Sequence, residues 1–484
     1  MNRPADPIRI VVIGGGVSGL AAAHRLIERR GEENLPLEVV VLEAGDTPGG
    51  SIRTTRRDGF LLEAGPDSFI TEKPWGLALC RRLGLSDSII RTNDQHRLTF
   101  IIRRGRMYAL PDGFLMLAPT KMWPFVFSGL FSLRGKMRMA LDLLLPRGNL
   151  DDDESLASFV TRRLGREALE RAAQPLVSGI YTADPVNLSL QATMPRFLEM
   201  ERKYRSLIRA MRVAGKMRAK AGRTEAGARY SMFVTLADGM DTLVNAIVAR
   251  IGADAVRTGH QVTRLSRNDH GRPWSVHVAD REPISADGVI LAAPAYSLAQ
   301  MTADLAADLS AMFGCIRYAS SATLNLAYRR EQIGHPLNGF GFVVPHIERR
   351  TIIASTFSHV KFAGRAPEGM ALLRAFIGGA LNEDIYALDD DELRRTATAE
   401  LTDLLSIRGE PAFTVLNRWP QSMPQYAVGH LDHVARITDR LSRLPPVGVA
   451  GNAFGGVGIP DCVRSGEGAA DTVLNALGHS VPTT

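Results

Sequence analysis

The chain has 484 residues, enough for two or three domains with a large hydrophobic core. Hydrophobic residues make up 45% and charged residues 23%, as in an ordinary globular protein. The cysteines Cys80, Cys315 and Cys462 are too far apart for a disulfide framework or a zinc site, and they suit a reducing compartment. No apolar run reaches the roughly 18 residues of a membrane-spanning helix. No signal peptide is expected, because residues 1–7 are short and polar.

The net charge of +7 is unevenly spread. The segment from Arg196 to Tyr230 holds eleven Lys or Arg and three Glu, so it carries the whole excess of positive charge. A solvated basic helix, a patch for anionic lipid and a patch for an anionic substrate are all compatible with this segment. Nucleic acid is not expected as a partner, because no recognised nucleic-acid module accompanies the patch.

The first elements predict a dinucleotide site. Residues 8–13 form a β-branched run typical of a buried parallel strand, and residues 20–26 have helical composition. The glycines between them suit a tight turn, a close approach of backbone to pyrophosphate, and close packing of helix on strand. The N-terminus of the helix offers N–H groups to the phosphates. The candidate residues are Gly14, Gly15, Gly16, Val17, Ser18 and Gly19.

A second strand, residues 37–42, ends in Glu43, followed by Ala44. An acidic residue at the end of the second strand accepts hydrogen bonds from a ribose hydroxyl. The succession of a strand, a glycine loop, a helix, a second strand and an acidic residue favours a dinucleotide site over a simple tight turn.

The segment Gly49-Gly50-Ser51-Ile52-Arg53 suggests a second approach of backbone to ligand, with Arg53 able to pair with phosphate. Glu followed by Gly-Gly and Arg resembles the FAD-binding family of amine oxidases, phytoene desaturases and protoporphyrinogen oxidases. The resemblance implies FAD rather than NAD. It also implies that the turn Gly65, Pro66, Asp67, Ser68 lies against the flavin.

A short helix is then predicted over residues 77–83, and a hairpin over residues 100–110 with Arg97 at its entrance. Residues 113–148 mix apolar and aromatic side chains with cations. This pattern fits helices lying in a membrane interface and fits equally a buried helical subdomain, with the charge-poor residues 122–133 slightly favouring the membrane. Amphipathic helices follow at 155–164 and 167–176.

From residue 232 the pattern returns to the nucleotide domain. It predicts a helix over 243–251 and strands over 256–265, 275–279 and 288–292. From residue 322 the pattern is rich in strands, followed by a helix over 390–405. The C-terminal stretch is again strand, glycine turn and helix, with Pro460 suited to a first helical turn. In the resembling family, Val262 places its backbone against the adenine, and Asn452, Val457, Gly458 and Ile459 meet the flavin.

The predicted fold is α/β and α+β: a Rossmann-like FAD-binding domain, an antiparallel-sheet substrate domain and a helical, membrane-associated insertion. We expect residues 1–90, 232–298 and 432–484 in the first, 91–112 and 299–431 in the second, and 113–231 in the third.

More specific elements, Gly339 to Pro345 and Met423 to His430, resemble the oxygen-dependent protoporphyrinogen oxidases and their bacterial coproporphyrinogen III oxidase relatives. The resemblance implies a six-electron oxidation of a porphyrinogen in haem biosynthesis, with non-covalent FAD and with dioxygen as acceptor. Flavin N5 would accept the hydride, and no acid–base pair stands out in the motifs. It also implies a propionate partner in Arg97, a further one in Lys73, and an apolar pocket of Phe340, Gly341, Val343 and Phe376.

Other functions stay open. The second candidate is a non-covalent flavin amine or polyamine oxidase, the third a carotenoid desaturase, and a non-enzymatic flavin-binding protein is the rival from another class. The resemblance does not choose between protoporphyrinogen and coproporphyrinogen, and a homodimer stays open. The expected location is the cytoplasm, with or without peripheral contact with the cytoplasmic face of the membrane.

Overall fold

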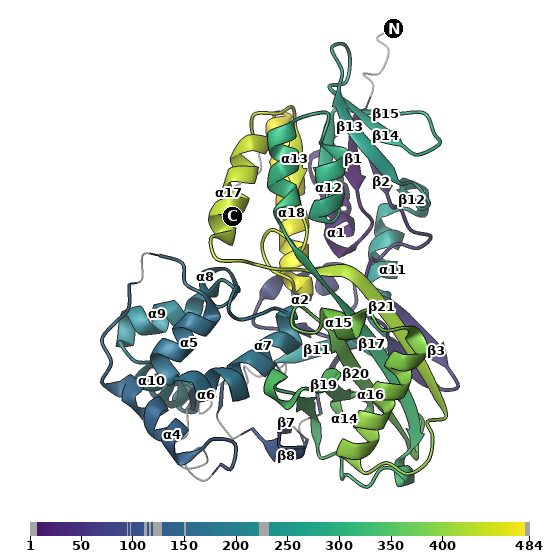
Figure 1. Cartoon of the computed structure of the whole chain (residues 1–484). Coiled ribbons are helices and arrows are strands. Elements are labelled where there is room, and N and C mark those ends of the chain that lie inside the picture. The colour runs from purple at the N-terminus through teal and green to yellow at the C-terminus, as the bar shows by residue number, and fades with distance from the viewer. Residues whose placement is uncertain are drawn as a thin grey trace.

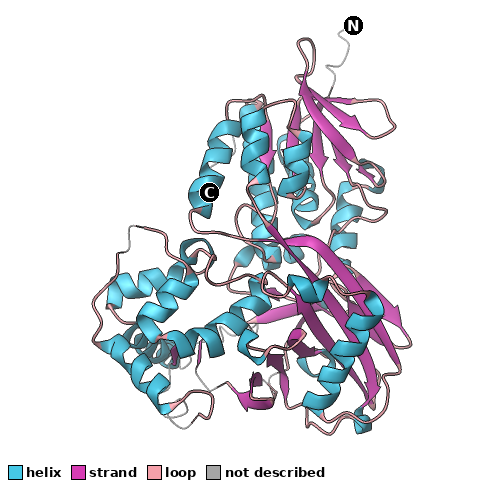
Figure 2. Ribbon diagram, viewed as in Figure 1, coloured by secondary structure: helices cyan, strands magenta, loops and turns pink. Residues whose placement is uncertain are grey.

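The structure is a computed structural model of the chain with three visible parts, shown in Figure 1. A nucleotide-type domain lies at the top, a large sheet at the lower right, and a lobe built of helices at the lower left. Figure 2 shows how helices and strands are divided among these parts. The structure describes residues 7–93, 95–96, 98–110, 114–115, 118–119, 128–149, 152–221 and 232–479.

A five-stranded parallel sheet forms the centre of the first domain, in the order β12-β2-β1-β16-β22. Its middle strands are apolar on both faces, as the β-branched composition predicts for a sheet covered on both sides. Three chain regions supply these strands, so the N-terminal strand is completed by strands from the middle and the end of the chain. The strands are β1 (Ile8–Ile13), β2 (Leu37–Leu42), β12 (Val256–Arg257), β16 (Gly288–Leu291) and β22 (Val447–Val449).

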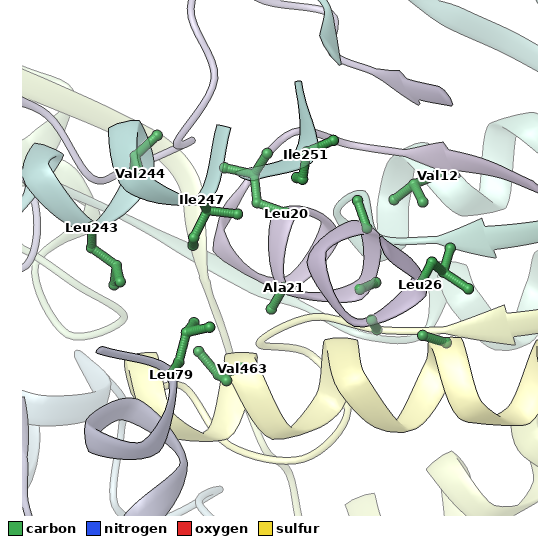
Figure 3. Packing of buried hydrophobic residues seen from close by; sticks show 14 of the residues in the cluster. Val12, Leu20, Ala21, Leu26, Leu79, Leu243, Val244, Ile247, Ile251 and Val463 are labelled. Atoms are coloured by element: carbon green, nitrogen blue, oxygen red, sulfur yellow. The ribbon is translucent and has the colours of Figure 1, made fainter. Parts of the chain in front are cut away.

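One face of this sheet packs against helices. Leu20 and Leu26 of the first helix, with Val12 of β1 and Val463 of the last helix, are fully buried in one cluster (Figure 3). Hydrophobic burial of this kind contributes about 1.5–3 kcal/mol for each large side chain. The helices are α1 (Val17–Glu33), α2 (Pro74–Arg82), α11 (Asp241–Ile251) and α18 (Ile459–Ala476).

The opposite face is covered by a three-stranded antiparallel sheet and three helices, with Trp274 fully buried between the layers. These elements are β13 (Val262–Arg267), β14 (Trp274–Val278), β15 (Ile284–Ala286), α12 (Ala295–Met301), α13 (Ala307–Gly314) and α17 (His430–Leu441).

The strand predicted over residues 256–265 is wrong as a single element. The structure has two strands here, β12 and β13, and they belong to different sheets. Gly259 lies between them with a φ of +62° and turns the chain, because glycine adopts this left-handed conformation without a steric penalty. Val262 is therefore the first residue of β13.

The second domain is built on a seven-stranded sheet, in the order β21-β17-β20-β19-β18-β7-β8. Every neighbouring pair in it is antiparallel except β18 with β7, which confirms the predicted, largely antiparallel sheet. One face packs under α16, whose Leu393, Ala397 and Leu401 are fully buried. The strands are β7 (Leu98–Arg103), β8 (Arg106–Ala109), β17 (Tyr318–Arg329), β18 (Gly339–Val343), β19 (Ile352–Phe357), β20 (Met370–Gly378) and β21 (Phe413–Pro424), with helices α14 (Ser358–Lys361), α15 (Glu383–Tyr386) and α16 (Asp390–Leu405).

Smaller sheets link the parts. A hairpin of two strands packs on the large sheet, a three-stranded sheet joins the core of the nucleotide domain, and a two-stranded pair follows β8 in the chain. They are β3 (Thr54–Arg57) with β4 (Phe60–Glu63), β5 (Phe69–Ile70) with β11 (Phe233–Leu236) and β6 (Ile89–Arg91), and β9 (Phe114–Leu115) with β10 (Ala118–Pro119).

The helical lobe has its own core, which contains Phe159 and Phe197. Ser155 caps its second helix, as the sequence predicts, and accepts a hydrogen bond from the N–H of Ser158. The next predicted helix extends further than residue 176 and contains a π-helical turn, Leu169–Ala173. The helices are α4 (Leu133–Ala140), α5 (Leu156–Leu164), α6 (Arg166–Ala168), α7 (Gln174–Tyr181), α8 (Leu190–Thr193), α9 (Pro195–Tyr204) and α10 (Leu207–Ala221).

A buried ion network holds this lobe together. Arg163, Asp142 and Glu201 are each fully buried, and Arg163 Nε donates to Asp142 Oδ1 over 2.7 Å. Asp142 Oδ2 also accepts hydrogen bonds from the Ser206 hydroxyl and the Ile208 N–H, so the buried charges are paired and hydrogen-bonded.

In the described part of the chain, no helix is long and apolar enough to span a membrane.

Candidate functional site

The loop between β1 and α1 has the geometry that a dinucleotide site needs. Gly14 has a φ of +110°, and a Cβ atom there would lie 2.5 Å from the carbonyl oxygen of Ala292. A Cβ at Gly19 would lie 1.9 Å from the carbonyl oxygen of Gly14, so helix and loop pack at backbone distance. A Cβ at Gly16 would meet nothing within 4 Å. The loop is therefore tight where it turns and packs, and open at Gly16, where the motif places the pyrophosphate.

The N-terminus of α1 faces this opening without a competing cap. Gly16 is the N-cap residue, it makes no side-chain capping bond, and the first turn, which holds Val17 and Ser18, contains no acidic residue. The first N–H groups of a helix carry partial positive charge and bind anions well. The residues present at this N-terminus therefore fit the binding of a phosphate group.

Glu43 lies against the glycine loop. Its carboxylate accepts hydrogen bonds from the N–H of Gly15, over 2.6 Å, and of Gly45, over 2.8 Å. These bonds fix the side chain at the end of β2, beside the exposed Ala44. Glu43 is thereby placed where the second strand of a dinucleotide site presents its acid.

The second glycine segment packs directly on the first. The N–H of Gly49 donates to the carbonyl oxygen of Gly15 over 2.8 Å. A Cβ atom at Gly50 would lie 3.3 Å from Gly16 Cα. A Cβ at Gly65 would lie 1.9 Å from the carbonyl oxygen of Ser51. The three segments that the sequence analysis assigned to one ligand are thus brought together around the glycine loop. The guanidinium of Arg53, which is exposed, stands over the Trp419 ring at 5.8 Å.

The turn from Gly65 through Pro66 to Ser68 is tied to the large sheet. Trp419 Nε1 donates to the carbonyl oxygen of Ala64 over 3.0 Å, and the buried Arg374 guanidinium donates to the carbonyl oxygen of Gly65. The turn is therefore held where the two domains meet.

Asp67 in this turn forms an ion pair across the same boundary. Lys361 Nζ, at the end of α14, lies 3.0 Å from each carboxylate oxygen, and the Ser68 hydroxyl donates to Asp67 over 2.6 Å. Burial raises the pKa of Asp67, but the charges of Lys361 and Arg374 outweigh it and hold the pKa well below its usual range. The carboxylate is ionised at every physiological pH.

The C-terminal segment begins at Asn452, whose side-chain amide donates to the carbonyl oxygen of Ser422 over 3.2 Å. Gly458 is the N-cap of α18, where Ile459 is the first helical residue, and Val457 packs on the core of the helical lobe. The residues predicted to meet the flavin thus form a second helix N-terminus, beside the lobe.

Lys73 lies next to this helix. Its ammonium pairs with Asp461 Oδ2 over 2.6 Å, and the Asp461 side chain is 5% exposed while that of Lys73 is 44% exposed. The family resemblance implies that Lys73 pairs with a substrate propionate. The structure brings it instead to the first turn of α18, and its role toward substrate stays a prediction.

Three of the predicted pocket residues share one face of the large sheet. Val343 pairs with Ala354, which pairs with Phe376, and the alternation of strands places these residues on the same side as Gly341. Phe340 lies at an irregularity of the β18–β7 register, half-buried. Arg97 lies outside the described residues. Val262 is buried at the start of β13, and its contact with adenine stays a prediction.

Three further residues at this site, Arg374, Lys361 and Trp419, are not indicated by the sequence motifs. The sequence does offer a pattern that could have indicated Arg374, because it is a single cation within the otherwise apolar strand Met370–Gly378. Its guanidinium lies 4.8 Å from the Phe376 ring centroid, on the face of the sheet that holds the predicted pocket residues. Lys361 carries no local signal, since its partner is almost 300 residues away in the chain.

The fold and the site define a flavoprotein oxidoreductase, and the comparisons with known proteins agree. The sequence profile of the family "Flavin containing amine oxidoreductase" matches residues 17–474, so the chain belongs to this family.

Within the family the chain is similar to porphyrinogen oxidases along its whole length. It is 37% identical to the coproporphyrinogen III oxidase of Bacillus subtilis, covering 97% of this chain and 98% of that protein. It is 30% identical to the protoporphyrinogen oxidase of Bos taurus, covering 97% and 99%. A crystal structure from Exiguobacterium sp. 255-15, assigned provisionally as a protoporphyrinogen oxidase, superposes with a TM-score of 0.85 at 29% identity, covering 99% and 100%.

Proposed function

We propose that this protein binds FAD without a covalent bond and oxidises a porphyrinogen to the porphyrin in haem biosynthesis, with dioxygen as acceptor. The observation that carries the proposal is the full-length similarity to the Bacillus subtilis enzyme, together with a glycine loop that is open only at Gly16. Coproporphyrinogen III is the proposed substrate, because that relative is more similar than the protoporphyrinogen oxidase of Bos taurus.

Bound FAD supplies a two-electron acceptor, which must be used three times for a six-electron oxidation. The residues of the chain bind and orient. Gly16 and the N-terminus of α1 would hold the pyrophosphate, and Glu43 the ribose. The sheet face with Val343 and Phe376 offers an apolar surface for a flat macrocycle. Arg97 and Lys73 are the proposed partners of propionates, by charge-assisted hydrogen bonds.

Asp67 and Lys361 form a fixed ion pair at this boundary between the domains. Because Lys361 and Arg374 lower the pKa of Asp67, its carboxylate stays ionised and does not serve as a proton acceptor.

The proposal is tested by supplying the two porphyrinogens side by side to FAD-loaded protein in air. We expect porphyrin fluorescence to rise with both and faster with coproporphyrinogen III, with one hydrogen peroxide formed for each two electrons removed. Protein without FAD is the control for spontaneous oxidation. No fluorescence gain with either compound, combined with peroxide from a polyamine, would replace the proposal by the amine oxidase alternative.

Peripheral membrane contact by the helical lobe is a further part of the proposal. Four exposed apolar side chains lie along one side of α4 and the turn that follows, as their spacing requires. They are Leu133 (73% exposed), Met137 (56%), Leu141 (47%) and Leu144 (72%). Apolar side chains flanked by cations such as Lys136 suit the surface of an anionic bilayer. Leu130 and Phe131, in contrast, are buried in the core of the lobe. Residues 113, 116–117 and 120–127 of the predicted interface segment 113–148 lie outside the described residues.

The proposed location is the cytoplasm, with peripheral contact with the membrane. Wild-type protein is therefore expected to co-sediment with anionic liposomes at low salt. A Leu133→Ser, Leu144→Ser double variant should lose most of this binding. Val186→Ser changes an equally exposed residue, at 62%, outside the stripe, and should bind as the wild type does. Wild-type protein that stays in the supernatant would contradict membrane contact and leave the enzymatic proposal untouched.

A further inference from the structure

Tyr426 lies where all three parts of the molecule meet. Its side chain is 2% exposed and belongs to the core of the helical lobe, although the residue follows directly on β21 of the large sheet. The ring stacks on the His430 ring with centroids 4.2 Å apart and planes 10° apart. A ring held this way leaves its hydroxyl in a fixed position.

That hydroxyl lies against the C-terminal segment of the proposed flavin site. It donates to the carbonyl oxygen of Asn452 and accepts from the N–H of Gly456, the latter over 2.9 Å. Two backbone groups four residues apart are thus joined through one phenol. Gly456 has a φ of +131°, and a Cβ there would lie 2.4 Å from Asp461 Cγ, so the segment is tightly shaped at this point.

The backbone around Tyr426 is fastened to the helical lobe. The N–H of Ser189 donates to the carbonyl oxygen of Tyr426 over 2.8 Å, and the N–H of Val428 donates to Asn187 over 3.1 Å. Asp153 accepts from the N–H of Gly429 over 2.8 Å. The backbone from Tyr426 to Gly429 is therefore hydrogen-bonded to the lobe, while the hydroxyl of Tyr426 is hydrogen-bonded to the segment of residues 452–456.

The ionisation states keep this contact intact. Burial raises the pKa of the Tyr426 hydroxyl, so it stays a donor, and burial lowers the pKa of His430 to about 4, so its ring is neutral under the phenol.

We propose that Tyr426 is a positioning residue that holds residues 452–456 in the shape FAD binding requires and fixes this segment to the helical lobe. The inference rests on the proposed FAD site. Removing the hydroxyl leaves the half-buried N–H of Gly456 and C=O of Asn452 without this partner, so the segment relaxes and must be reshaped each time FAD binds.

The test is a Tyr426→Phe variant of the full-length holoenzyme, with FAD release followed by free-flavin fluorescence on dilution. We expect the dissociation constant of FAD to rise roughly 5- to 50-fold and the visible absorption bands of the bound flavin to change. Tyr328→Phe is the matched control, because Tyr328 is fully buried in the core beneath α16, and it should leave both readouts as in the wild type.

The outcomes separate the two proposals. A wild-type protein that binds no FAD would overturn both. A Tyr426→Phe variant that binds FAD with wild-type affinity and spectrum, even with a lower melting temperature, would show a merely structural tyrosine and overturn this inference alone.

If the variant does not fold, hydrogen exchange of the wild type decides. FAD should then protect residues 424–430 together with residues 452–458, and unchanged exchange in 424–430 would overturn the coupling.

Discussion

A Gly19→Ala variant is expected to bind FAD at least about 100-fold more weakly, although it adds only one methyl group. The new Cβ would lie 1.9 Å from the carbonyl oxygen of Gly14 and 3.3 Å from Cβ of Ala292. Because the nearer atom belongs to the backbone of the glycine loop, the clash is relieved only by moving the loop or lifting α1 from the sheet. Titration of the purified variant with FAD, followed by flavin fluorescence, measures the effect.

Gly31→Ala is the matched control for this variant. Gly31 lies in the same helix, and a Cβ there would meet nothing within 4 Å. Alanine is the better helix former by about 0.5–1 kcal/mol, so this variant should bind FAD normally and be slightly more stable. Equal FAD binding by the two variants would contradict the assignment of Gly19 to close packing of helix on loop.

An Arg163→Leu variant is expected to destabilise the helical lobe by about 3–5 kcal/mol, because it leaves the buried carboxylate of Asp142 without its cation. Arg163 is fully buried and donates to Asp142 and to the carbonyl oxygens of Pro146 and Arg205. Urea unfolding followed by circular dichroism measures the change. A normal midpoint would show that the network contributes little to folding.

Arg166→Leu provides the comparison on the neighbouring helix. Arg166 also forms an ion pair, with Glu170, but its side chain is 83% exposed. Exposed pairs gain little, because water and salt screen them. No measurable change in the urea midpoint is expected for this variant.

The parts of the site that sequence reasoning predicted are local in the chain. The roles of Gly14, Gly16 and Gly19 follow from a strand, a turn and a helix within a short stretch, and the structure has the tight and open positions where the motif requires them. The helix over residues 390–405 is likewise confirmed, since Asp389 caps it and acidic residues fill its first turn.

What sequence reasoning missed depends on distant pairings. Lys361 and Arg374 reach the turn at Gly65 only because the large sheet packs against the nucleotide domain, and neither lies near it in the chain. β21 was not predicted, because Pro420 and Pro424 interrupt its pattern. Proline is tolerated there since β21 is an edge strand.

The parallel sheet also dictates when the nucleotide domain can form. β1 is flanked by β2 and β16, and the last strand, β22, and the last helix come from the C-terminal end. A Cβ at Gly466 of α18 would lie 2.1 Å from the carbonyl oxygen of Ser18, so α18 and α1 meet at backbone distance. During synthesis on the ribosome, β1 can pair early with β2, but its other edge waits for β16, and the sheet is complete only when β22 and α18 have emerged. Such non-local pairing slows folding and favours chaperone contact. Cofactor uptake then follows the synthesis of α18, and flavin content reports whether this helix was made and packed on α1.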